Sequence, residues 1–254
     1  MARTSYFDAP HPRRLAHRGL SQHQSGIDEN SIEAIEAAIE AGATHVESDT
    51  HATKDGTAVL FHDDNLERVA GVASDISELK LAELKAIQLL NGSSIPTLSE
   101  VFERFPDLYL NLDIKSEHAI EPTVRAIEEH RAHDRVLVSS FSESRRKQAL
   151  QLLSRPVATS ASMKLVILAW ASHTIAFGAG FRSLTREIDA FQIPVSRGPI
   201  KLATSSFIRR AQRANIEVHF WTINDPAEMK MLLELGADGI VSDRVDLLAK
   251  LKHS

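Results

Sequence analysis

The chain has 254 residues, of which 43% are hydrophobic and 25% are charged, and this is the composition of an ordinary globular protein. It contains no cysteine, so disulfides, thiolate nucleophiles and cysteine zinc sites are excluded. The formal net charge of −5 argues against a nucleic-acid binder, which needs a basic face.

Residues 1–14 contain neither an apolar run nor a small-residue cleavage site, so we expect no signal peptide. The most apolar stretch, residues 165–181, is interrupted by Ser172, His173 and Thr174 and is too short for a membrane span. We therefore expect a cytoplasmic protein without stable membrane insertion.

Short β-branched or apolar runs alternate with helical patterns along the chain. The predicted strands are residues 14–17, 45–49, 108–114, 136–140, 157–160, 190–195, 218–223 and 239–242. The predicted helices are residues 29–41, 97–105, 118–132, 142–153, 162–177, 204–214, 225–235 and 244–252. Eight strand–helix units in a chain of this length predict an α/β protein, a (β/α)8 TIM barrel that forms one domain over residues 1–254.

Capping residues indicate where the clearest helices begin and end. Asn30, with Glu33 three residues later, predicts a capping pair at the start of the first helix, and Gly42 marks its end. Asp225 and Gly236 bracket the helix at 225–235 in the same way.

The segment after Asp49 departs from the alternation because it is too short for a helical crossover. Its central Asp55-Gly56 pair is typical of a β-hairpin turn, and a symmetric fold about that pair places Asp49 opposite His62. Residues 64–107 then form a small insertion after this third strand-like segment, before the next barrel strand.

Acidic side chains stand at the ends of two predicted strands, where a parallel barrel carries its reactive groups. Glu47 and Asp49 are two residues apart, so they leave the same face of their strand. Asp113, on a neighbouring strand end, can supply a third oxygen. Hard oxygen ligands suit Mg²⁺ or Ca²⁺. The alternative for Glu47 and Asp49 is a solvated pair at the edge of the sheet or salt bridges to arginine and lysine.

Two histidines fall on the same rim of the predicted barrel, His17 at the end of the first strand and His62 in the hairpin. One can accept a proton from a nucleophile while the other gives one to a leaving oxygen. The alternative is a structural role, held by a hydrogen bond for His17 and by cross-strand pairing for His62.

Cations and an aromatic side chain complete the predicted site. Arg18 and Lys115 either hold an anionic phosphoryl group or neutralise the nearby carboxylates. Trp221, at the end of its strand, forms either a pocket wall or part of the core.

These motifs together resemble the glycerophosphodiester phosphodiesterase family, and the likeness spans almost the whole chain. The matching segments are L-A-H-R-G at 15–19, D-E-N-S-I-E-A at 28–34, A-T-H-V-E-S-D-T at 43–50, K-D-G-T-A-V-L-F-H-D-D-N-L-E-R at 54–68, I-P-T-L-S-E-V-F at 95–102, V-L-V-S-S-F at 136–141, V-H-F-W-T-I-N-D at 218–225 and G-A-D-G-I-V-S-D at 236–243.

The resemblance implies metal-dependent hydrolysis of a small-molecule glycerophosphodiester to sn-glycerol 3-phosphate and an alcohol. It implies that a divalent ion, Mg²⁺ or Ca²⁺, binds to the acids at 47, 49 and 113. It assigns proton transfer to His17 and His62 and phosphate binding to the cations at 18 and 115. In the family's usual scheme the neighbouring glycerol hydroxyl attacks phosphorus, and water then opens the cyclic phosphate.

The chain departs from the family pattern at two positions. Asp113 stands where the family usually has glutamate, so its carboxylate reaches one methylene less far. Asp28 stands where the family has proline, and Glu29 beside it matches a family glutamate.

Three other functions stay open at this point. They are a phospholipase D-like or cyclising phosphodiesterase on the same barrel, a metal-dependent amide or ester hydrolase, and a barrel that binds phosphate esters without turnover. The histidine-arginine-glycine motif, in place of a histidine-x-histidine motif on the first strand, argues against the second. The sequence predicts no nucleic-acid partner and gives no oligomeric state.

Overall fold

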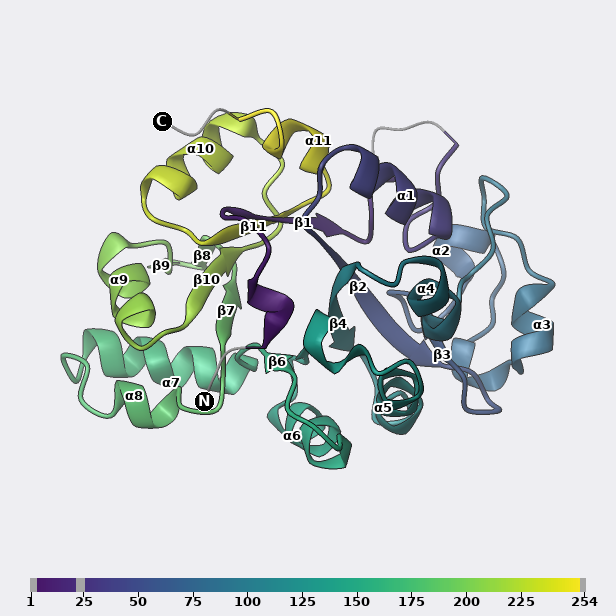
Figure 1. Ribbon diagram of the computed structural model, residues 1–254, viewed down its shortest axis with the longest axis horizontal. Coiled ribbons are helices and arrows are strands. Elements are labelled where there is room, and N and C mark those ends of the chain that lie inside the picture. The colour runs from purple at the N-terminus through teal and green to yellow at the C-terminus, as the bar shows by residue number, and fades with distance from the viewer. Residues whose placement is uncertain (1–3, 22–25, 252–254) are drawn as a thin grey trace.

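The computed structural model describes residues 4–21 and 26–251, which form a parallel barrel surrounded by helices (Figure 1). The barrel strands are β1 (Arg13–His17), β2 (His45–Ala52), β4 (Tyr109–Ile114), β5 (Val136–Ser139), β6 (Ala158–Thr159), β7 (Ala190–Ile193), β10 (Glu217–Phe220) and β11 (Gly239–Ser242). Their order is β6-β5-β4-β2-β1-β11-β10-β7. A bridge between Ser160 and Ala190 brings β6 beside β7, so the eight-stranded barrel is nearly closed, which confirms the predicted fold.

The helices around the barrel are α1 (Ile32–Glu40), α4 (Leu98–Arg104), α5 (Ile120–Glu129), α6 (Glu143–Leu152), α7 (Met163–Thr174), α8 (Phe181–Leu184), α9 (Ser205–Arg213), α10 (Pro226–Glu234) and α11 (Val245–Leu248). Every predicted helix has a counterpart, but four predicted bounds differ from the observed ones by three residues or more: the start at 29 and the ends at 132, 177 and 252. Residues 175–177 are not helical, because the chain takes positive φ at Phe177 and again at Gly178 and Gly180 before α8 begins. The last helix ends at Leu248, and residue 252 lies outside the described residues.

The N-cap of α1 is Ser31, not Asn30. The Ser31 hydroxyl accepts a hydrogen bond from the Ala34 amide, whereas Asn30 has φ 57° and cannot take the extended conformation of an N-cap. Its side chain instead accepts a hydrogen bond from the Ser48 hydroxyl on β2 at 2.7 Å. The cap predicted at Asp225 is confirmed, because its carboxylate accepts from the Glu228 amide.

The predicted hairpin forms between β2 and β3 (Ala58–Leu60), but its predicted register is wrong by one residue. Thr50 pairs with Leu60, and the Phe61 amide bonds to the Asp49 carbonyl, so Asp49 does not oppose His62. A two-residue turn at Asp55-Gly56 would need positive φ at both positions. Only Gly56 has it, at 80°, and the turn is therefore one residue longer.

The segment predicted as an insertion contains α2 (Glu67–Ala70), the 3₁₀ turn η2 (Ile76–Glu78), α3 (Leu81–Lys85) and finally α4. Val69, Ile76 and Leu84 pack with the hairpin residues Val59 and Phe61 in a small apolar cluster of their own. The apolar side chains of α4, in contrast, pack in the main barrel core. The boundaries of the insertion and of the domain stay predictions.

The N-terminal segment closes one end of the barrel. In the 3₁₀ turn η1 (Ser5–Phe7), the buried Tyr6 ring lies 4.6 Å from the His45 ring and 6.0 Å from the Tyr109 ring. A second 3₁₀ turn, η3 (Ala132–Arg135), and a two-stranded hairpin of β8 (Ser196–Arg197) and β9 (Ile200–Lys201) complete the fold. Within the described residues, no helix has the length and apolar character needed to cross a membrane.

Candidate active site

All eight side chains predicted for the site line one cavity of about 500 Å³ at the C-terminal ends of the barrel strands. They are His17, Arg18, Glu47, Asp49, His62, Asp113, Lys115 and Trp221. Strand alternation explains the acids, since residues 47, 49 and 113 all point into the barrel. The register of β2 and β4 sets Asp49 directly beside Asp113.

Lys115 lies between these two aspartates. Its ammonium is 2.7 Å from Asp49 Oδ1 and 2.9 Å from Asp113 Oδ2. Burial would lower the pKa of Lys115, but the two carboxylates outweigh burial and raise it. Lys115 therefore carries a full charge and neutralises part of the acidic cluster.

Three carboxylate oxygens remain without a hydrogen-bond donor among the described residues: Glu47 Oε2, Asp49 Oδ2 and Asp113 Oδ1. Burial and the neighbouring Asp49 raise the pKa of Glu47 to about 7, and burial also raises the pKa of Asp113. Each buried carboxylate oxygen that has no donor costs stability unless a cation approaches it.

The donor chemistry fits a divalent ion, because three buried carboxylates are the hard oxygen ligands that Mg²⁺ and Ca²⁺ take. As they stand, however, no three acidic or histidine side chains in the described part of the chain are close enough together to enclose a metal. The Lys115 ammonium lies between two of the acids, and an incoming cation would compete with it.

His17 is held by a carboxylate that the sequence analysis did not select. Its Nδ1 lies 2.7 Å from Asp243 Oδ1, and Asp243 accepts a further hydrogen bond from Asn224 Nδ2 at 2.7 Å. Burial would raise the pKa of Asp243, but the bonds from His17 and Asn224 lower it. An ionised carboxylate only accepts hydrogen bonds, so the Nδ1 of His17 carries a proton and its Nε2 is the free nitrogen.

That free nitrogen lies in an acidic environment, 3.8 Å from Glu47 Oε2. Burial would lower the pKa of His17, but Glu47 and Asp243 together raise it. His17 is therefore a stronger base than an exposed histidine.

His62 has an equivalent partner, since its Nδ1 lies 2.6 Å from Asp63 Oδ1. Asp63 also accepts a hydrogen bond from Arg68 Nε at 2.6 Å. Burial would raise the pKa of Asp63, but the bonds from Arg68 and His62 lower it to about 2. Asp63 therefore stays ionised and fixes the orientation of the His62 ring.

Arg68 continues this network across the site. Its guanidinium donates to both oxygens of Glu29, at 2.6 and 3.1 Å, and Glu29 accepts from Arg18 Nη1 at 3.0 Å. Arg18 Nε lies 3.5 Å from Asp49 Oδ2. A chain of charged contacts thus connects His62 on one side of the cavity with the acidic cluster on the other.

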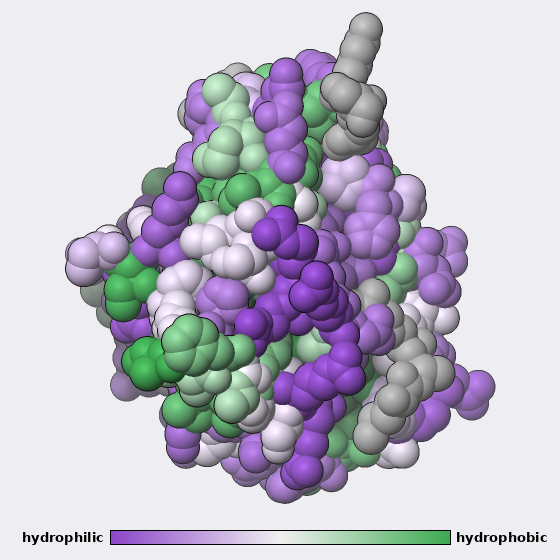
Figure 2. Space-filling model, turned by 90° about the vertical axis from the view of Figure 1, so that its left-hand side faces the viewer, coloured by the Kyte–Doolittle hydropathy of each residue, from purple (hydrophilic) through white to green (hydrophobic). Residues whose placement is uncertain are grey.

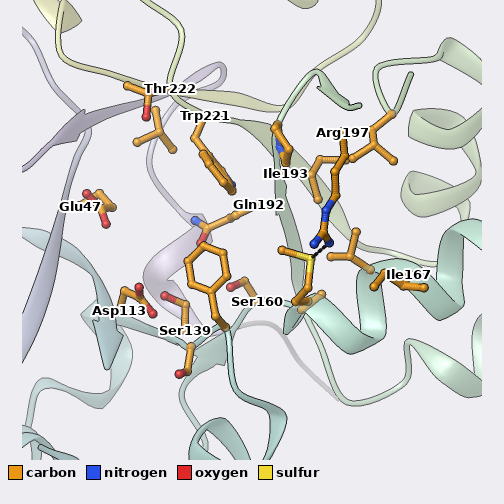
Figure 3. A pocket seen from close by; sticks show the side chains of 18 of the residues that line it. Glu47, Asp113, Ser139, Ser160, Ile167, Gln192, Ile193, Arg197, Trp221 and Thr222 are labelled. Atoms are coloured by element: carbon orange, nitrogen blue, oxygen red, sulfur yellow. Dashed lines mark hydrogen bonds between the residues drawn. The ribbon is translucent and has the colours of Figure 1, made fainter. Parts of the chain in front are cut away.

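The other half of the cavity is apolar. In Figure 3, Glu47 and Asp113 lie on one side, Ile167, Ile193 and Arg197 lie on the opposite side, and Trp221 projects between them. The Phe141 and Trp221 rings meet edge to face at 6.1 Å. Trp221 is thus a pocket wall, which was one of its two predicted roles.

Sequence reasoning missed Asp243, Asn224 and Arg68 as members of the site. Asp243 directly follows β11, so the strand-end rule that selected His17 could have selected it too. Asn224 and Arg68 lie on loops and on the insertion, where no local pattern indicates which side chain they meet.

A family model described as the glycerophosphoryl diester phosphodiesterase family matches residues 17–247. "Probable glycerophosphodiester phosphodiesterase 2" of Mycobacterium tuberculosis is 39% identical over 235 residues, which cover 92% of this chain and 88% of that protein. Lysophospholipase D GDPD1 of Homo sapiens is 27% identical over 285 residues, 95% of this chain and 86% of that protein. The structure of an Oleispira antarctica phosphodiesterase in complex with the product sn-glycerol-3-phosphate matches with a TM-score of 0.71 and 25% identity, over 95% of this chain and 96% of that one.

Proposed function

Since the chain belongs to the glycerophosphoryl diester phosphodiesterase family, we propose that it hydrolyses glycerophosphodiesters with two histidines and a divalent ion. The products would be sn-glycerol 3-phosphate, the product bound in the Oleispira antarctica structure, and an alcohol. The observation that carries the proposal is a pair of carboxylate-held imidazoles, at positions 17 and 62, lining one cavity with three acids and two cations.

His17 would remove the proton from the attacking hydroxyl. Its Nδ1 is occupied by Asp243, so its Nε2 is the accepting nitrogen, and the raised pKa of the ring makes it an effective base. Asp243 would stabilise the imidazolium that forms, as a carboxylate does when it bonds the other nitrogen of a catalytic histidine.

His62 would protonate the departing alcohol. The Asp63 carboxylate accepts the hydrogen bond of its Nδ1, so Nε2 is the nitrogen that would donate the proton. His17 would thus act where the bond from the nucleophile to phosphorus forms, and His62 where the bond from phosphorus to the leaving oxygen breaks.

Arg18 and Lys115 would hold the phosphoryl oxygens, since a guanidinium and an ammonium are the usual partners of that group. Glu47, Asp49 and Asp113 would hold the divalent ion. When it is bound, such an ion neutralises charge on a phosphoryl oxygen and lowers the pKa of a hydroxyl.

The test is turnover of glycerophosphocholine by His17→Ala and His62→Ala in the presence of Mg²⁺ or Ca²⁺. We expect each variant to lose at least about 100-fold in kcat, and His130→Ala, outside the cavity, to keep full activity. EDTA should abolish turnover and either ion should restore it. Wild-type kcat in either site variant would refute the assignment of the histidines, and full activity without metal would refute the role of the acids.

A second substrate class is favoured by the apolar half of the cavity, where Ile167, Trp170 and Leu202 are among the lining side chains. The polar glycerol phosphate part of a substrate cannot cover these apolar side chains, whereas the acyl chain of a diester that carries one on its glycerol can. This is the activity that the name of the human relative describes.

Two substrates distinguish the alternatives, glycerophosphocholine and its 1-acyl form. If acylated diesters are accepted, Ile167→Asn should lower the ratio of their kcat/KM values, acylated over deacylated, by about tenfold. An unchanged ratio would exclude the acyl-chain site. Phosphorus NMR of the products separates hydrolysis from a reaction that stops at the cyclic phosphate, and tight binding without product would indicate a non-catalytic barrel.

A further inference from the structure

A group of exposed apolar side chains lies at the outer edge of the cavity. This apolar rim consists of Phe141, Ile167, Leu168, Ile175, Phe177 and Ile200, whose exposed fractions run from 39% for Leu168 to 88% for Phe177. Four of the six, at positions 141, 167, 175 and 200, also line the cavity. The cavity therefore runs without interruption from the buried acids to an apolar surface.

The most exposed members of the rim are Phe177, at 88%, and Ile175, at 78%. Leu168 and Ile175 are seven residues apart and lie on one face of α7 and the residue that follows it, and Phe177 stands beyond the end of the helix. Figure 2, which faces the side that carries α7, α8 and α9, shows a raised hydrophobic area at the lower left beside a hydrophilic band. Exposed apolar patches of this kind mark interaction sites.

The segment that carries most of the rim is rich in basic residues. Residues 160–215 contain eight lysines and arginines and only two acids, a formal charge of +6, although the whole chain has a charge of −5. Lys164 precedes Leu168 by one turn on α7, and Arg197 and Lys201 lie on the β8–β9 hairpin beside Ile200. Among the described residues, no carboxylate lies within ion-pair distance of Lys164, Arg197 or Lys201, although ion pairs are common elsewhere on the surface.

We propose that the apolar rim and the basic residues around it dock the protein onto an anionic lipid surface, with the mouth of the cavity facing the lipid. Apolar side chains flanked by lysine and arginine are the pattern of helices that lie in the membrane interface, and each basic residue near an anionic surface strengthens the attraction. A second copy of the chain is a poorer occupant, because it would set two basic regions against each other. The proposal concerns peripheral contact and needs no membrane-spanning helix.

The first experiment measures co-sedimentation of the full chain with two kinds of vesicle. One is phosphatidylcholine alone, and the other is phosphatidylcholine with an equal part of phosphatidylglycerol. We expect binding to the anionic vesicles only, and weaker binding as salt is added, because salt screens exposed charges. No binding to anionic vesicles, or equal binding to both kinds, would overturn the proposal.

The second experiment uses variants outside the cavity wall. Leu168→Ser/Phe177→Ser removes apolar rim side chains, and Lys164→Gln/Lys201→Gln removes two charges. Each pair should lower the vesicle partition coefficient at least about tenfold, while kcat/KM for water-soluble glycerophosphocholine stays unchanged. The matched controls are Leu90→Ser, an exposed leucine of the insertion, and Lys230→Gln, an exposed lysine of α10, and both should bind vesicles like the wild type.

If both double variants bound vesicles as well as the wild type does, the contact with lipid would lie elsewhere and the proposal would be overturned. A dimer in light scattering that disappears in Leu168→Ser/Phe177→Ser would identify a second copy as the occupant instead. Because the assay on glycerophosphocholine is separate, loss of catalytic activity would contradict the proposed function without bearing on the rim.

Discussion

Glu47 is buried, and one of its carboxylate oxygens accepts no hydrogen bond from the described residues. Its side chain lines the cavity near Asp49 and His17, and no donor in the described part of the chain bonds its Oε2. Burial and Asp49 raise its pKa to about 7. A buried carboxylate of this kind lowers the stability of the fold at any pH at which it is ionised. Such a cost is typical of a position kept for function instead of stability.

Replacing Glu47 by glutamine should therefore stabilise the metal-free protein while removing its activity. Because the pKa is raised in the folded state, the charge costs stability as pH rises from about 4.5 through 7. At pH 8 in EDTA, Glu47→Gln should gain roughly 2 kcal/mol, or about 5 °C in Tm, and below pH 4.5 the gain should vanish.

Thermal unfolding over this pH range measures the effect, with the exposed Glu40→Gln on α1 as the control. Added Mg²⁺ or Ca²⁺ should raise the Tm of the wild type and leave that of Glu47→Gln nearly unchanged, since a ligand stabilises only the state that binds it. A variant that is less stable than the wild type at pH 8 would contradict the prediction.

Strand-end chemistry made the individual site residues predictable from sequence. Glu47, Asp49 and Asp113 follow from alternation on strands, which is a local property. The partners of the histidines depend on tertiary structure, because Asp243 reaches His17 only when β11 pairs with β1. Neutralising the nearby carboxylates was one of the two roles predicted for Lys115. Only the distances in the structure show that its ammonium contacts both Asp49 and Asp113.

At the scale of elements, the insertion and the barrel are joined by charged contacts at the edge of the site. Asp28 accepts hydrogen bonds from the backbone amides of Asn91 and Ser93 in the insertion. Arg68, on α2, connects Asp63 with Glu29. The departure from the family pattern at Asp28 thus has a structural use, and the insertion positions His62 from outside the cavity.

Replacing Arg68 by methionine should consequently impair proton transfer by His62, although Arg68 itself would not contact the substrate. We expect kcat for glycerophosphocholine to fall about 10- to 100-fold, the usual effect of removing an outer partner, with little change in KM because the phosphate-binding residues remain. Arg68→Lys should recover part of the loss, since it keeps the charge but not the fork of donors.

The comparison variant is Arg104→Met, which breaks the exposed pair between Arg104 and Glu36 and should leave kcat unchanged. If Arg68→Met altered KM alone, the contact with Asp63 would not position His62. Equal melting temperatures of both methionine variants would show that the effect on kcat is local.

The hairpin illustrates why elements are easier to predict than their register. The Asp55-Gly56 pair correctly indicated a turn after Asp49, because both residue types favour turns. The register depended on whether Asp55 would take positive φ, and it does not. Since side chains alternate, this single torsion changes which residue faces Asp49, and composition alone does not specify it.

At the scale of the whole molecule, the two ends of the barrel differ in how their buried charged side chains are paired. At the N-terminal end, Arg13 Nη2 and Nε lie 2.9 and 3.2 Å from the two oxygens of Glu217, and His219 Nε2 lies 2.9 Å from Glu217 Oε2. At the C-terminal end, three carboxylate oxygens have no hydrogen-bond donor within residues 4–21 and 26–251. In such barrels, stability is associated with the first end and chemistry with the second.

Glu217→Gln should therefore destabilise the fold without changing kcat. The variant leaves the buried Arg13 charge without its counterion, which costs about 3–5 kcal/mol, or roughly 10 °C in Tm. Burial would raise the pKa of Glu217, but His219 and Arg13 hold it well below its ordinary value of 4.5. A depressed carboxyl pKa stabilises the fold above pH 4.5, and this contribution is lost as pH falls toward the folded-state value.

The difference in Tm between wild type and Glu217→Gln should accordingly be largest at neutral pH and shrink below pH 4.5. Glu36→Gln, which loses an exposed pair with Arg104, is the matched control and should differ from the wild type by less than about 1 kcal/mol at every pH. If the difference in Tm between the wild type and Glu217→Gln stayed constant from neutral to acidic pH, the destabilisation would come from altered packing and not from the lost charge. A fall in kcat at a temperature where the variant is folded would contradict the division of roles between the two ends.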